Sequence, residues 1–353
     1  MTNESKLPNP TPRVSVVVPC RNEEAFIVTC VENIFSQDYP ADKFEVLVAD
    51  GMSTDSTKAL LLALSRKHDY LKLFENAQQT VPFALNMMIR NASGDVIVRM
   101  DAHAEYPRNY VSTLVQHLYA LEADNVGGVW ETMAGANTNQ AKAIALATSH
   151  KLGIGNAAYR LGASEPVEVD TVPYGCYRKT VFDKIGFFDE QLTRNQDDEF
   201  NARLIKNAGK IFLIPSVRIK YFARKNLRSL AKMFYQYGYF KPLVGIKIGY
   251  PATSRQLAPP LFVVAFIVLL LGALVHPLFY FLFLLDILVY LVAILFVSVG
   301  IALKHGMRLF IYLLLTFPAI HFSYGFGYLH GILDFMLLRK HKRGFAKTLD
   351  TNR

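Results

Sequence analysis

The chain has 353 residues, a length that fits about two domains of ~100–200 residues each. Its three cysteines are an odd number and show no metal spacing such as Cys-x-x-Cys, which favours reduced, mostly buried thiols. The formal net charge of +9 could serve nucleic acid or anionic lipid, but no nucleic-acid-binding motif is present and basic residues flank the most apolar stretch, so we expect a membrane partner and no nucleic acid.

The first part of the chain alternates strand and helix signals. Residues 1–13 are polar and proline-rich, which predicts a disordered segment without the apolar core of a secretory signal. Continuous apolar runs at Val14–Cys20, Phe44–Asp50 and Asp95–Asp101 predict strands buried on both faces. The other expected elements are a strand at 71–75 and helices at 23–37, 54–68 and 82–91. This alternation predicts an α/β domain with a parallel sheet over residues 14–220.

Several of these strands end in residues suited to ligand binding. Pro19, Asp50 and Asp101 fall at the carboxyl ends of parallel strands, where open α/β sheets bind their ligands, so we expect them to cluster. The sequence Pro19-Cys-Arg-Asn-Glu stands where a dinucleotide-binding protein would have Gly-x-Gly-x-x-Gly, which argues against a dehydrogenase. Asp101 and His103 could hold Mn²⁺ or Mg²⁺ against a diphosphate, and the imidazole favours Mn²⁺; an ordinary surface loop is the alternative.

A second acidic group opens a helix further along the chain. The segment Asn195–Leu204 contains Asp197, Asp198 and Glu199 in succession, followed by apolar residues at helical spacing. Interaction with the helix dipole explains one acid but not three. One of these carboxylates could therefore act as a general base toward an acceptor hydroxyl, a role typically worth ~10²–10⁴-fold in rate. An edge strand is expected at 211–215.

The C-terminal third is membrane material. Residues 221–256 form a linker whose segment 227–247 reads as an interfacial amphipathic helix or, alternatively, a soluble core helix. Residues 257–338 hold three apolar stretches of spanning length, and residues 339–353 form a basic tail. Three full spans would place this tail outside, against the positive-inside rule, whereas a broken or re-entrant third segment would keep it inside. The candidate spans are Leu257–Val275, Leu278–Leu303 and Arg308–Leu338.

Four motifs in order resemble glycosyltransferase family 2. They are Val14–Glu24, the turn from Asp50 to Asp55, Asp101-Ala-His103 and Asp197-Asp198-Glu-Phe-x-x-Arg203. The resemblance covers residues 13–215 and implies the Rossmann-like GT-A fold, which binds nucleotide sugars, followed here by a helical transmembrane region. Further motifs resemble the bacterial glucosyltransferases of succinoglycan-type exopolysaccharide assembly. These motifs are Arg99–Ala104, Gly153–Asn156 with Tyr159 and Arg160, and Val169–Arg178.

The resemblance also implies site residues. Asp198 would be the catalytic base, and Asp101 with His103, which replaces the usual Asp of the family, would hold Mn²⁺ or Mg²⁺. The residues implied for the donor are Pro19, Arg21, Glu23, Asp50 and Asp101. The residues implied for the acceptor are Gly175, Cys176 and Asp197.

The implied function is a membrane-bound inverting glycosyltransferase of bacterial polysaccharide biosynthesis. It would move a hexose, with glucose expected, from a UDP-sugar to a polyprenyl-diphosphate-linked saccharide, with a cytoplasmic catalytic domain on a multi-pass inner-membrane protein. The segment Gln236-Tyr-Gly-Tyr-Phe240 lacks the Arg and Trp of the Gln-x-x-Arg-Trp motif of processive synthases, which favours transfer of a single sugar. The alternative is a non-catalytic membrane protein that uses the domain for binding or assembly.

Overall fold

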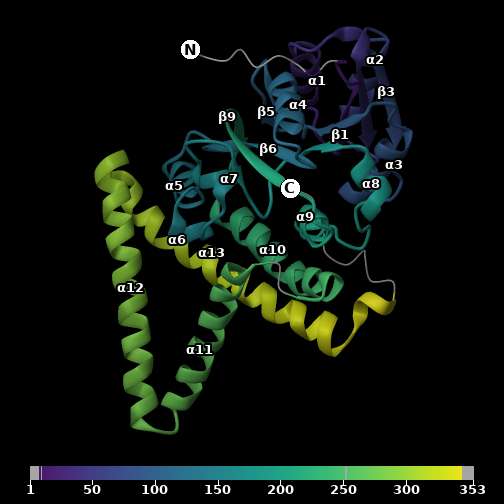
Figure 1. Cartoon of the computed structure of the whole chain (residues 1–353). Coiled ribbons are helices and arrows are strands. Elements are labelled where there is room, and N and C mark those ends of the chain that lie inside the picture. The colour runs from purple at the N-terminus through teal and green to yellow at the C-terminus, as the bar shows by residue number, and fades with distance from the viewer. Residues whose placement is uncertain (1–7, 9, 251–252, 344–353) are drawn as a thin grey trace. The chain divides into compact units, whose positions relative to one another are not determined.

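The computed structural model describes Pro8, residues 10–250 and residues 253–343, so most of the expected N-terminal segment and the end of the basic tail lie outside the described residues. The chain forms two compact units (Figure 1). The first comprises residues 1–131 and 158–221, and the second comprises residues 132–157 and 222–353. The expected catalytic domain over residues 14–220 therefore differs in one segment, 132–157, which packs with the C-terminal helices.

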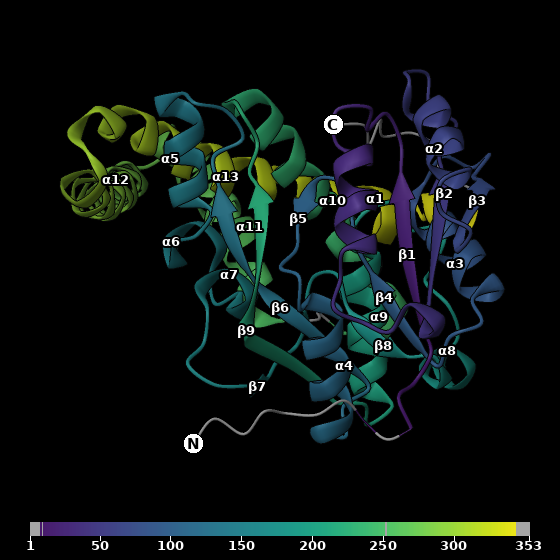
Figure 2. The ribbon, with the colours of Figure 1, turned by 90° about the horizontal axis from the view of Figure 1, so that it is seen from above.

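The first unit is built on one nine-stranded sheet with the order β3-β2-β1-β4-β8-β6-β9-β5, and β7 pairs with β9 (Figure 2). Strands β3, β2, β1 and β4 are parallel, whereas β8 runs antiparallel to β4 and β6. The strands are β1 (Val14–Cys20), β2 (Phe44–Asp50), β3 (Leu71–Glu75), β4 (Val96–Arg99), β5 (Ala104–Glu105), β6 (Asn125–Met133), β7 (Val167–Glu168), β8 (Cys176–Arg178) and β9 (Ile211–Phe222).

Helices cover both faces of this sheet because alternate residues of its central strands point to opposite sides. Val16 and Val18 of β1 pack with residues of α1, α2 and α4, whereas Val17 packs with residues of α3, α8 and α9. The helices of this unit are α1 (Ile27–Phe35), α2 (Thr57–Ser65), α3 (Val81–Asn91), α4 (Tyr110–Ala120), α7 (Ala158–Leu161), α8 (Thr180–Ile185) and α9 (Gln196–Lys206), with a 3-10 turn at Ala41–Lys43. The continuous apolar runs of the sequence therefore form the middle layer.

The expected bounds of β1, β2 and β3 are confirmed, but the expected edge strand at 211–215 is wrong. Strand β9 runs from Ile211 to Phe222 and has β6 and β5 as neighbours in the sheet, with β7 paired to it as well. The strand continues through Pro215 to Phe222.

A buried acid ties together the amino-terminal ends of the parallel strands. Glu45 is 1% exposed and accepts hydrogen bonds from Ser15 Oγ at 2.5 Å and from the backbone N–H of Ser93 at 2.6 Å. Lys72 Nζ lies 2.8 Å from its other oxygen. Burial alone would raise the pKa of Glu45, but these three partners outweigh it and lower that pKa to about 2. The carboxylate is therefore charged throughout the neutral range and links three elements.

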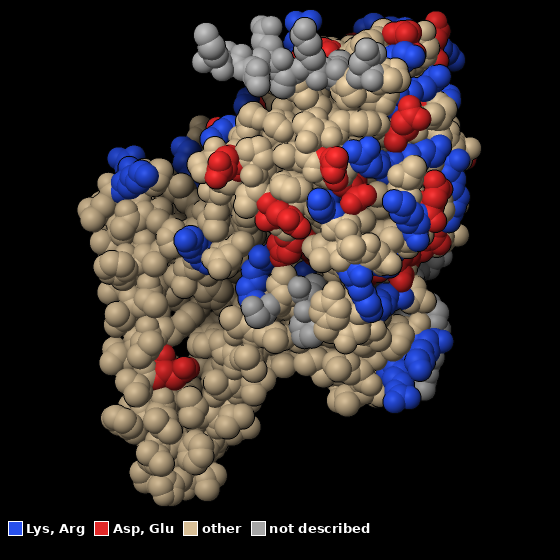
Figure 3. Space-filling model, viewed as in Figure 1, with Lys and Arg blue, Asp and Glu red and all other residues tan. Residues whose placement is uncertain are grey.

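The second unit is helical. Its helices are α5 (Asn139–Ala147), α6 (Lys151–Ile154), α10 (Leu227–Ile248), α11 (Ala258–Ala273), α12 (Pro277–His305) and α13 (Phe310–Gly331), with short turns at Ser254–Leu257, Met307–Leu309 and Lys340–Arg343 and a π-helical turn at Ile332–Leu337. Among the described residues, three segments are long and apolar enough to cross a membrane: Arg255–Ala273, Pro277–His305 and Met307–Leu337. Figure 3 shows the surface of helices α11 and α12 as almost uniformly uncharged.

Helices α10 and α13 run side by side in the same direction at unusually close range. A Cβ atom on Gly327 would lie 2.1 Å from the carbonyl oxygen of Tyr235, and one on Gly331 would lie 2.2 Å from that of Tyr239. A Cβ atom on Gly238 would likewise meet the carbonyl of Tyr324 at 2.1 Å. Only glycine allows the two backbones to approach this closely, as in packed membrane helices.

Candidate active site

The turn after β2 places an acid at the carboxyl edge of the sheet. Asp50 is 5% exposed, and its register partner at the end of β1 is Cys20. Its carboxylate accepts hydrogen bonds from the hydroxyl of Ser53 at 2.5 Å and from the Ser53 backbone N–H at 3.2 Å. These bonds fix the orientation of Asp50 at the strand end, next to Pro19, which pairs with Ala49 in the same register.

The loop that follows β1 is locked onto the turn that follows β2. The backbone N–H of Asn22 donates to Ser53 Oγ at 2.9 Å, and that of Glu23 donates to Thr57 Oγ1 at 2.8 Å. Asp55 accepts from the N–H groups of Glu24 and Thr57 at 3.2 Å and 3.0 Å. Asp55 is therefore a turn acid just before α2, which begins at Thr57.

Arg21 carries an unsatisfied donor within this loop. Its Nε atom is buried and makes no hydrogen bond to any described residue. The side chain lies over Gly51, where an added Cβ would be 3.2 Å from Arg21 Cβ. A buried guanidinium donor without a partner costs free energy unless a ligand supplies an acceptor. This atom therefore fits an anionic or carbonyl-bearing ligand at the strand ends.

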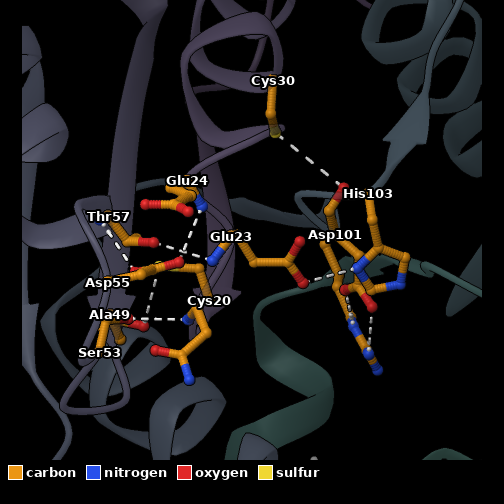
Figure 4. A network of polar contacts seen from close by, with 12 residues as sticks. Cys20, Glu23, Glu24, Cys30, Ala49, Ser53, Asp55, Thr57, Asp101 and His103 are labelled. Atoms are coloured by element: carbon orange, nitrogen blue, oxygen red, sulfur yellow. Dashed lines mark hydrogen bonds and ion pairs between the residues drawn. The ribbon is translucent and has the colours of Figure 1, made fainter. Parts of the chain in front are cut away.

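Asp101 and His103, the next two predicted residues, follow β4 and lie near Glu23 (Figure 4). Arg99 donates to both oxygens of Asp101, with Nε–Oδ1 at 2.8 Å and Nη2–Oδ2 at 3.0 Å. The Nδ1 atom of His103 lies 3.0 Å from Oε1 of Glu23. The thiol of Cys30 lies 4.0 Å from the backbone carbonyl of Asp101, and burial raises the pKa of that thiol to about 12.

These contacts bear on whether the residues could hold a metal ion. No group of three His, Cys, Asp or Glu residues suitable for a metal occurs among the described residues. Asp101 retains lone pairs beyond its two bonds to Arg99, and the contact with Glu23 leaves Nε2 of His103 as the second ring nitrogen. One carboxylate and one imidazole fit a divalent ion only if a ligand, such as a diphosphate, supplies further oxygens.

The three acids of the later helix have different surroundings. Glu199 is 4% exposed and binds Arg203 through both oxygens, at 2.7 Å and 2.9 Å, so it stabilises α9 internally. Asp197 and Asp198 are half-buried in the first turn of α9, and Asp197 Oδ1 accepts the backbone N–H of Asp198 at 3.0 Å.

Arg99 links that helix to the strand ends. Burial opposes its charge, but the Asp101 carboxylate, with Asp197 as a second negative neighbour, raises the pKa of the Arg99 guanidinium. Asp197 therefore lies within electrostatic range of Arg99. Sequence reasoning did not assign Arg99 to the site, although Arg99 and Asp101 are two residues apart and so share one side of an extended chain.

Gly175 and Cys176 lie beside the same strand but within tight packing. The carbonyl of Gly175 accepts the backbone N–H of Arg99 at 3.0 Å, and a Cβ on Gly175 would meet the ring of Tyr177 at 2.4 Å. The side chain of Cys176 is fully buried in the core. Cys176 therefore offers only its backbone to a ligand, and its place at an acceptor site stays a prediction.

Three residues of the subgroup resemblance, Tyr159, Arg160 and Tyr174, lie around the ring of Trp130. The buried guanidinium of Arg160 lies 4.5 Å from the ring of Trp130 and 5.6 Å from that of Tyr159. Trp130 stacks on Tyr221 with a centroid distance of 3.9 Å and tilts against Tyr174 at 5.4 Å. This packing supports the segment before Gly175, because the rings hold Tyr174 in place.

With this geometry in hand, comparison with known proteins gives concordant results. Residues 15–186 match the model of Glycosyl transferase family 2. The chain is 30% identical over 225 residues to succinoglycan biosynthesis protein ExoA of Rhizobium meliloti, covering 63% of this chain and 67% of that protein. It is 29% identical over 326 residues to a Methanococcus voltae protein, covering 91% of this chain and 97% of the other. That protein is the dolichyl N-acetyl-alpha-D-glucosaminyl phosphate 3-beta-D-2,3-diacetamido-2,3-dideoxy-beta-D-glucuronosyltransferase.

A solved structure shares the fold. The mannosyltransferase PcManGT from Pyrobaculum calidifontis, in complex with GDP-Man and Mn²⁺, superimposes with a TM-score of 0.59 over 92% of this chain and 88% of its own. The sequence identity is 21%, so the likeness concerns the fold alone.

Proposed function

Because the chain belongs to glycosyltransferase family 2, we propose that it transfers a hexose, with glucose expected, from a UDP-sugar to a lipid-linked saccharide, with inversion at the anomeric carbon. The observation that carries the proposal is the gathering of Asp50, Glu23, His103 and Asp101 at one edge of the parallel strands, with Asp197 within range of Arg99. This edge is where open α/β sheets bind nucleotides.

The donor half of the proposal rests on the loops after β1 and β2. Pro19, Arg21, Glu23 and Asp50 would border the uracil and ribose. Two observations support this assignment: Ser53 hydrogen-bonds to Asp50, and the buried Nε of Arg21 has no hydrogen-bond partner among the described residues. Asp101 would face the diphosphate.

Asp198 would provide the chemistry. Its carboxylate would take the proton of the acceptor hydroxyl while the acceptor oxygen forms a bond to the anomeric carbon. The bond from that carbon to the diphosphate breaks at the same time, and the diphosphate leaves with the electron pair. A single displacement inverts the anomeric centre. The position of Asp198 in the first turn of α9 supports this role, because the neighbouring Glu199 is committed to Arg203.

A divalent ion would stabilise the departing diphosphate when bound. Asp101 and His103 are the residues that would hold it, and the imidazole favours Mn²⁺ over Mg²⁺. The chain's own contribution is the pairing of Asp101 with Arg99 and of His103 with Glu23, which fixes both side chains in advance.

The acceptor half of the proposal combines the membrane helices with the names of two relatives. The Methanococcus voltae protein is named for a dolichyl-phosphate-linked sugar, and ExoA is named for succinoglycan biosynthesis. We infer a saccharide on a polyprenyl phosphate or diphosphate, bacterial polysaccharide biosynthesis, and a cytoplasmic catalytic domain on an inner-membrane protein. Gly175, Cys176 and Asp197 would lie on the acceptor side.

The decisive experiment compares Asp198→Asn with the intact protein, using a panel of labelled UDP-sugars and polyprenyl phosphate- and diphosphate-linked saccharides. The amide keeps the shape of the carboxyl but cannot take a proton, so transfer should fall by ~10²–10⁴-fold while donor binding persists. Asp183→Asn, an exposed acid on α8, is the matched control and should transfer normally. Unchanged transfer by Asp198→Asn would exclude this carboxylate as the base, whereas no transfer by the intact protein with any substrate of the panel would favour the binding or assembly alternative.

A further inference from the structure

Helices α11 and α12 form a hairpin whose depth in a membrane can be estimated. The tip residues Leu274 and Val275 are 81% and 86% exposed. Phe262 of α11 stacks on Tyr290 of α12 with ring centroids 4.5 Å apart, and residues 262–275 span roughly 20 Å at 1.5 Å per residue. If the tip reaches one surface of a hydrocarbon core about 30 Å thick, this ring pair lies about 10 Å below the other surface.

The ring pair is where α13 meets the hairpin. Phe322 of α13 lies 5.4 Å from Phe262 and 6.2 Å from Tyr290, and Gly325 of α13 packs against Pro259 at the start of α11. Helix α13 also begins directly after the other open end of the hairpin, at Phe310. It therefore joins the two open ends. Figure 1 shows α13 crossing the hairpin. In Figure 2, α12 is viewed almost down its axis, whereas α13 is viewed from the side.

The segments that pack against α13 would be unfavourable in the interior of a membrane. Helix α10 follows it closely at Gly327 and Gly331 and carries four cations, Arg228, Lys232, Lys241 and Lys247. Each such cation costs about 2.5–3.5 kcal/mol at the centre of a bilayer. If α13 crossed the membrane, α10 would be drawn in with it.

A second partner of α13 comes from the chain between β6 and α7. His321 Nε2 donates to the backbone carbonyl of Leu152 at 2.7 Å, and its Nδ1 accepts from Tyr290 Oη at 2.9 Å. The rings of His150 and Phe317 lie 6.2 Å apart. The segment 132–157 leaves the sheet and returns to it without any stretch that could span a membrane, so it stays on the same side of the membrane as the sheet.

The face of α13 away from these partners is apolar. Of the apolar 18-residue window of the third segment, 39% is buried, against 17% and 11% for the windows of the two hairpin helices. From Phe310 to Leu337 the exposed residues recur at helical spacing and are all apolar. They are Ile311, Leu315, Phe326, Leu333, Met336 and Leu337, and we call them the outer stripe.

The chain after α13 turns back toward α10. Asp334 is 2% exposed, and it accepts the Tyr239 hydroxyl at 2.7 Å and lies 2.7 Å from Lys340 Nζ. These contacts hold the start of the basic tail against the middle of α10. The tail therefore begins on the same side of the membrane as α10. The chain between α10 and the tail must then cross the membrane an even number of times.

We propose that α13 lies within a single leaflet on the side of α10, with the outer stripe in contact with lipid, and that the chain crosses the membrane only twice, through α11 and α12. The partner of the outer stripe is the acyl region of the bilayer. In-plane helices bury their apolar face about 5–10 Å below the headgroups, which agrees with the depth of the Phe262–Tyr290 pair. The proposal rests on the membrane attachment in the proposed function but not on the transfer reaction.

Depth measurement by spin labelling tests the proposal in the full chain in vesicles. The native thiols of Cys20, Cys30 and Cys176 are buried, so single introduced cysteines can be labelled selectively. Labels on α13 should all lie in one leaflet, although positions 311 and 337 are roughly 39 Å apart along a helix. Labels on α12 should pass through a maximum of depth. The positions on α13 and on the π-helical turn that continues it are 311, 315, 326, 333 and 337, and the α12 positions are 278, 285, 292 and 303.

Opposite surfaces for positions 311 and 337, with a maximum of depth between them, would overturn the proposal. Shallow labels at every α12 position would overturn it as well, through loss of the hairpin crossing, and would be distinguishable from a failure of the transfer assay. Labelling with a membrane-impermeant maleimide is a second test of topology, and it needs only single cysteine substitutions. Lys342→Cys should react only in inverted vesicles and Val275→Cys only in intact cells, and reaction of both from one side would contradict two crossings.

Discussion

Arg99 and Asp101 form a two-point ion pair at the end of β4, in which Nε and Nη2 of the guanidinium each donate to a different oxygen of the carboxylate. Arg99 is 8% exposed, and its backbone N–H also donates to the carbonyl of Gly175. One residue therefore orients the acid proposed to face the diphosphate and touches the segment proposed to border the acceptor. Arg99 acts through Asp101 and is a positioning residue.

Arg99→Lys should raise the KM for the donor and lower kcat/KM by about 10–100-fold, because an ammonium cannot hold both carboxylate oxygens. The estimate corresponds to one lost charge-assisted hydrogen bond of about 1.5–3 kcal/mol. Steady-state kinetics at varied donor concentration measure both KM and kcat/KM. Arg90→Lys on α3 is the matched control, since Arg90 is half exposed and lies 3.9 Å from Glu190. A pure loss of thermal stability with unchanged KM would contradict the positioning role.

Removal of divalent metal should abolish transfer, and Mn²⁺ should restore it better than Mg²⁺. His103→Asp should shift this preference toward Mg²⁺, because an all-oxygen set suits the harder ion. Activity titrations with each metal, after treatment with chelator, measure the preference. His103→Gln removes the ring without adding a charge and should lose activity with both metals. Full activity in chelator would exclude this part of the mechanism and leave the role of Asp198 intact.

The parallel half of the sheet could be predicted from the sequence because its strands are continuous apolar runs whose burial does not depend on distant partners. β1 and β2 have the bounds that the runs indicate. β9 was misplaced as an edge, since its neighbours β6 and β5 are set by long-range pairing. The same limit applied to the site: acids at strand ends were visible, but the partnership of Glu23 with His103, 80 residues apart, was not.

Glu45 should make stability fall in acid. Its folded-state pKa is about 2, below the ordinary value of 4.5, so its contribution is complete above pH 5 and is lost as the pH falls toward 2. A depression of this size corresponds to up to about 3 kcal/mol in the free energy of unfolding. Glu45→Gln should lower stability at pH 7 and flatten its dependence on pH between 5 and 2. Denaturant unfolding in detergent at several pH values measures this.

The control for that prediction is Glu75→Gln. Glu75 also pairs with a lysine, Lys58, but its side chain is 60% exposed, and exposed ion pairs contribute little. We expect no measurable change in the free energy of unfolding of Glu75→Gln, at pH 7 or between pH 5 and 2. An equal loss of stability in both variants would mean that net charge, rather than the buried contacts of Glu45, sets the acid sensitivity.

Gly327→Ala should separate α10 from α13. The added Cβ would lie 2.1 Å from the backbone carbonyl of Tyr235, which cannot move as a side chain can, so one helix must shift. Overpacking of this kind costs about 1–3 kcal/mol. Gly300→Ala on α12 is the matched control, because an added Cβ there has no atom within 4 Å and alanine favours the helix. Thermal melts in detergent should therefore show a lower Tm for Gly327→Ala and an equal or higher Tm for Gly300→Ala. If both variants melted like the parent protein, the close approach of the two backbones would be wrong, and with it the argument that α13 must stay beside the cationic helix.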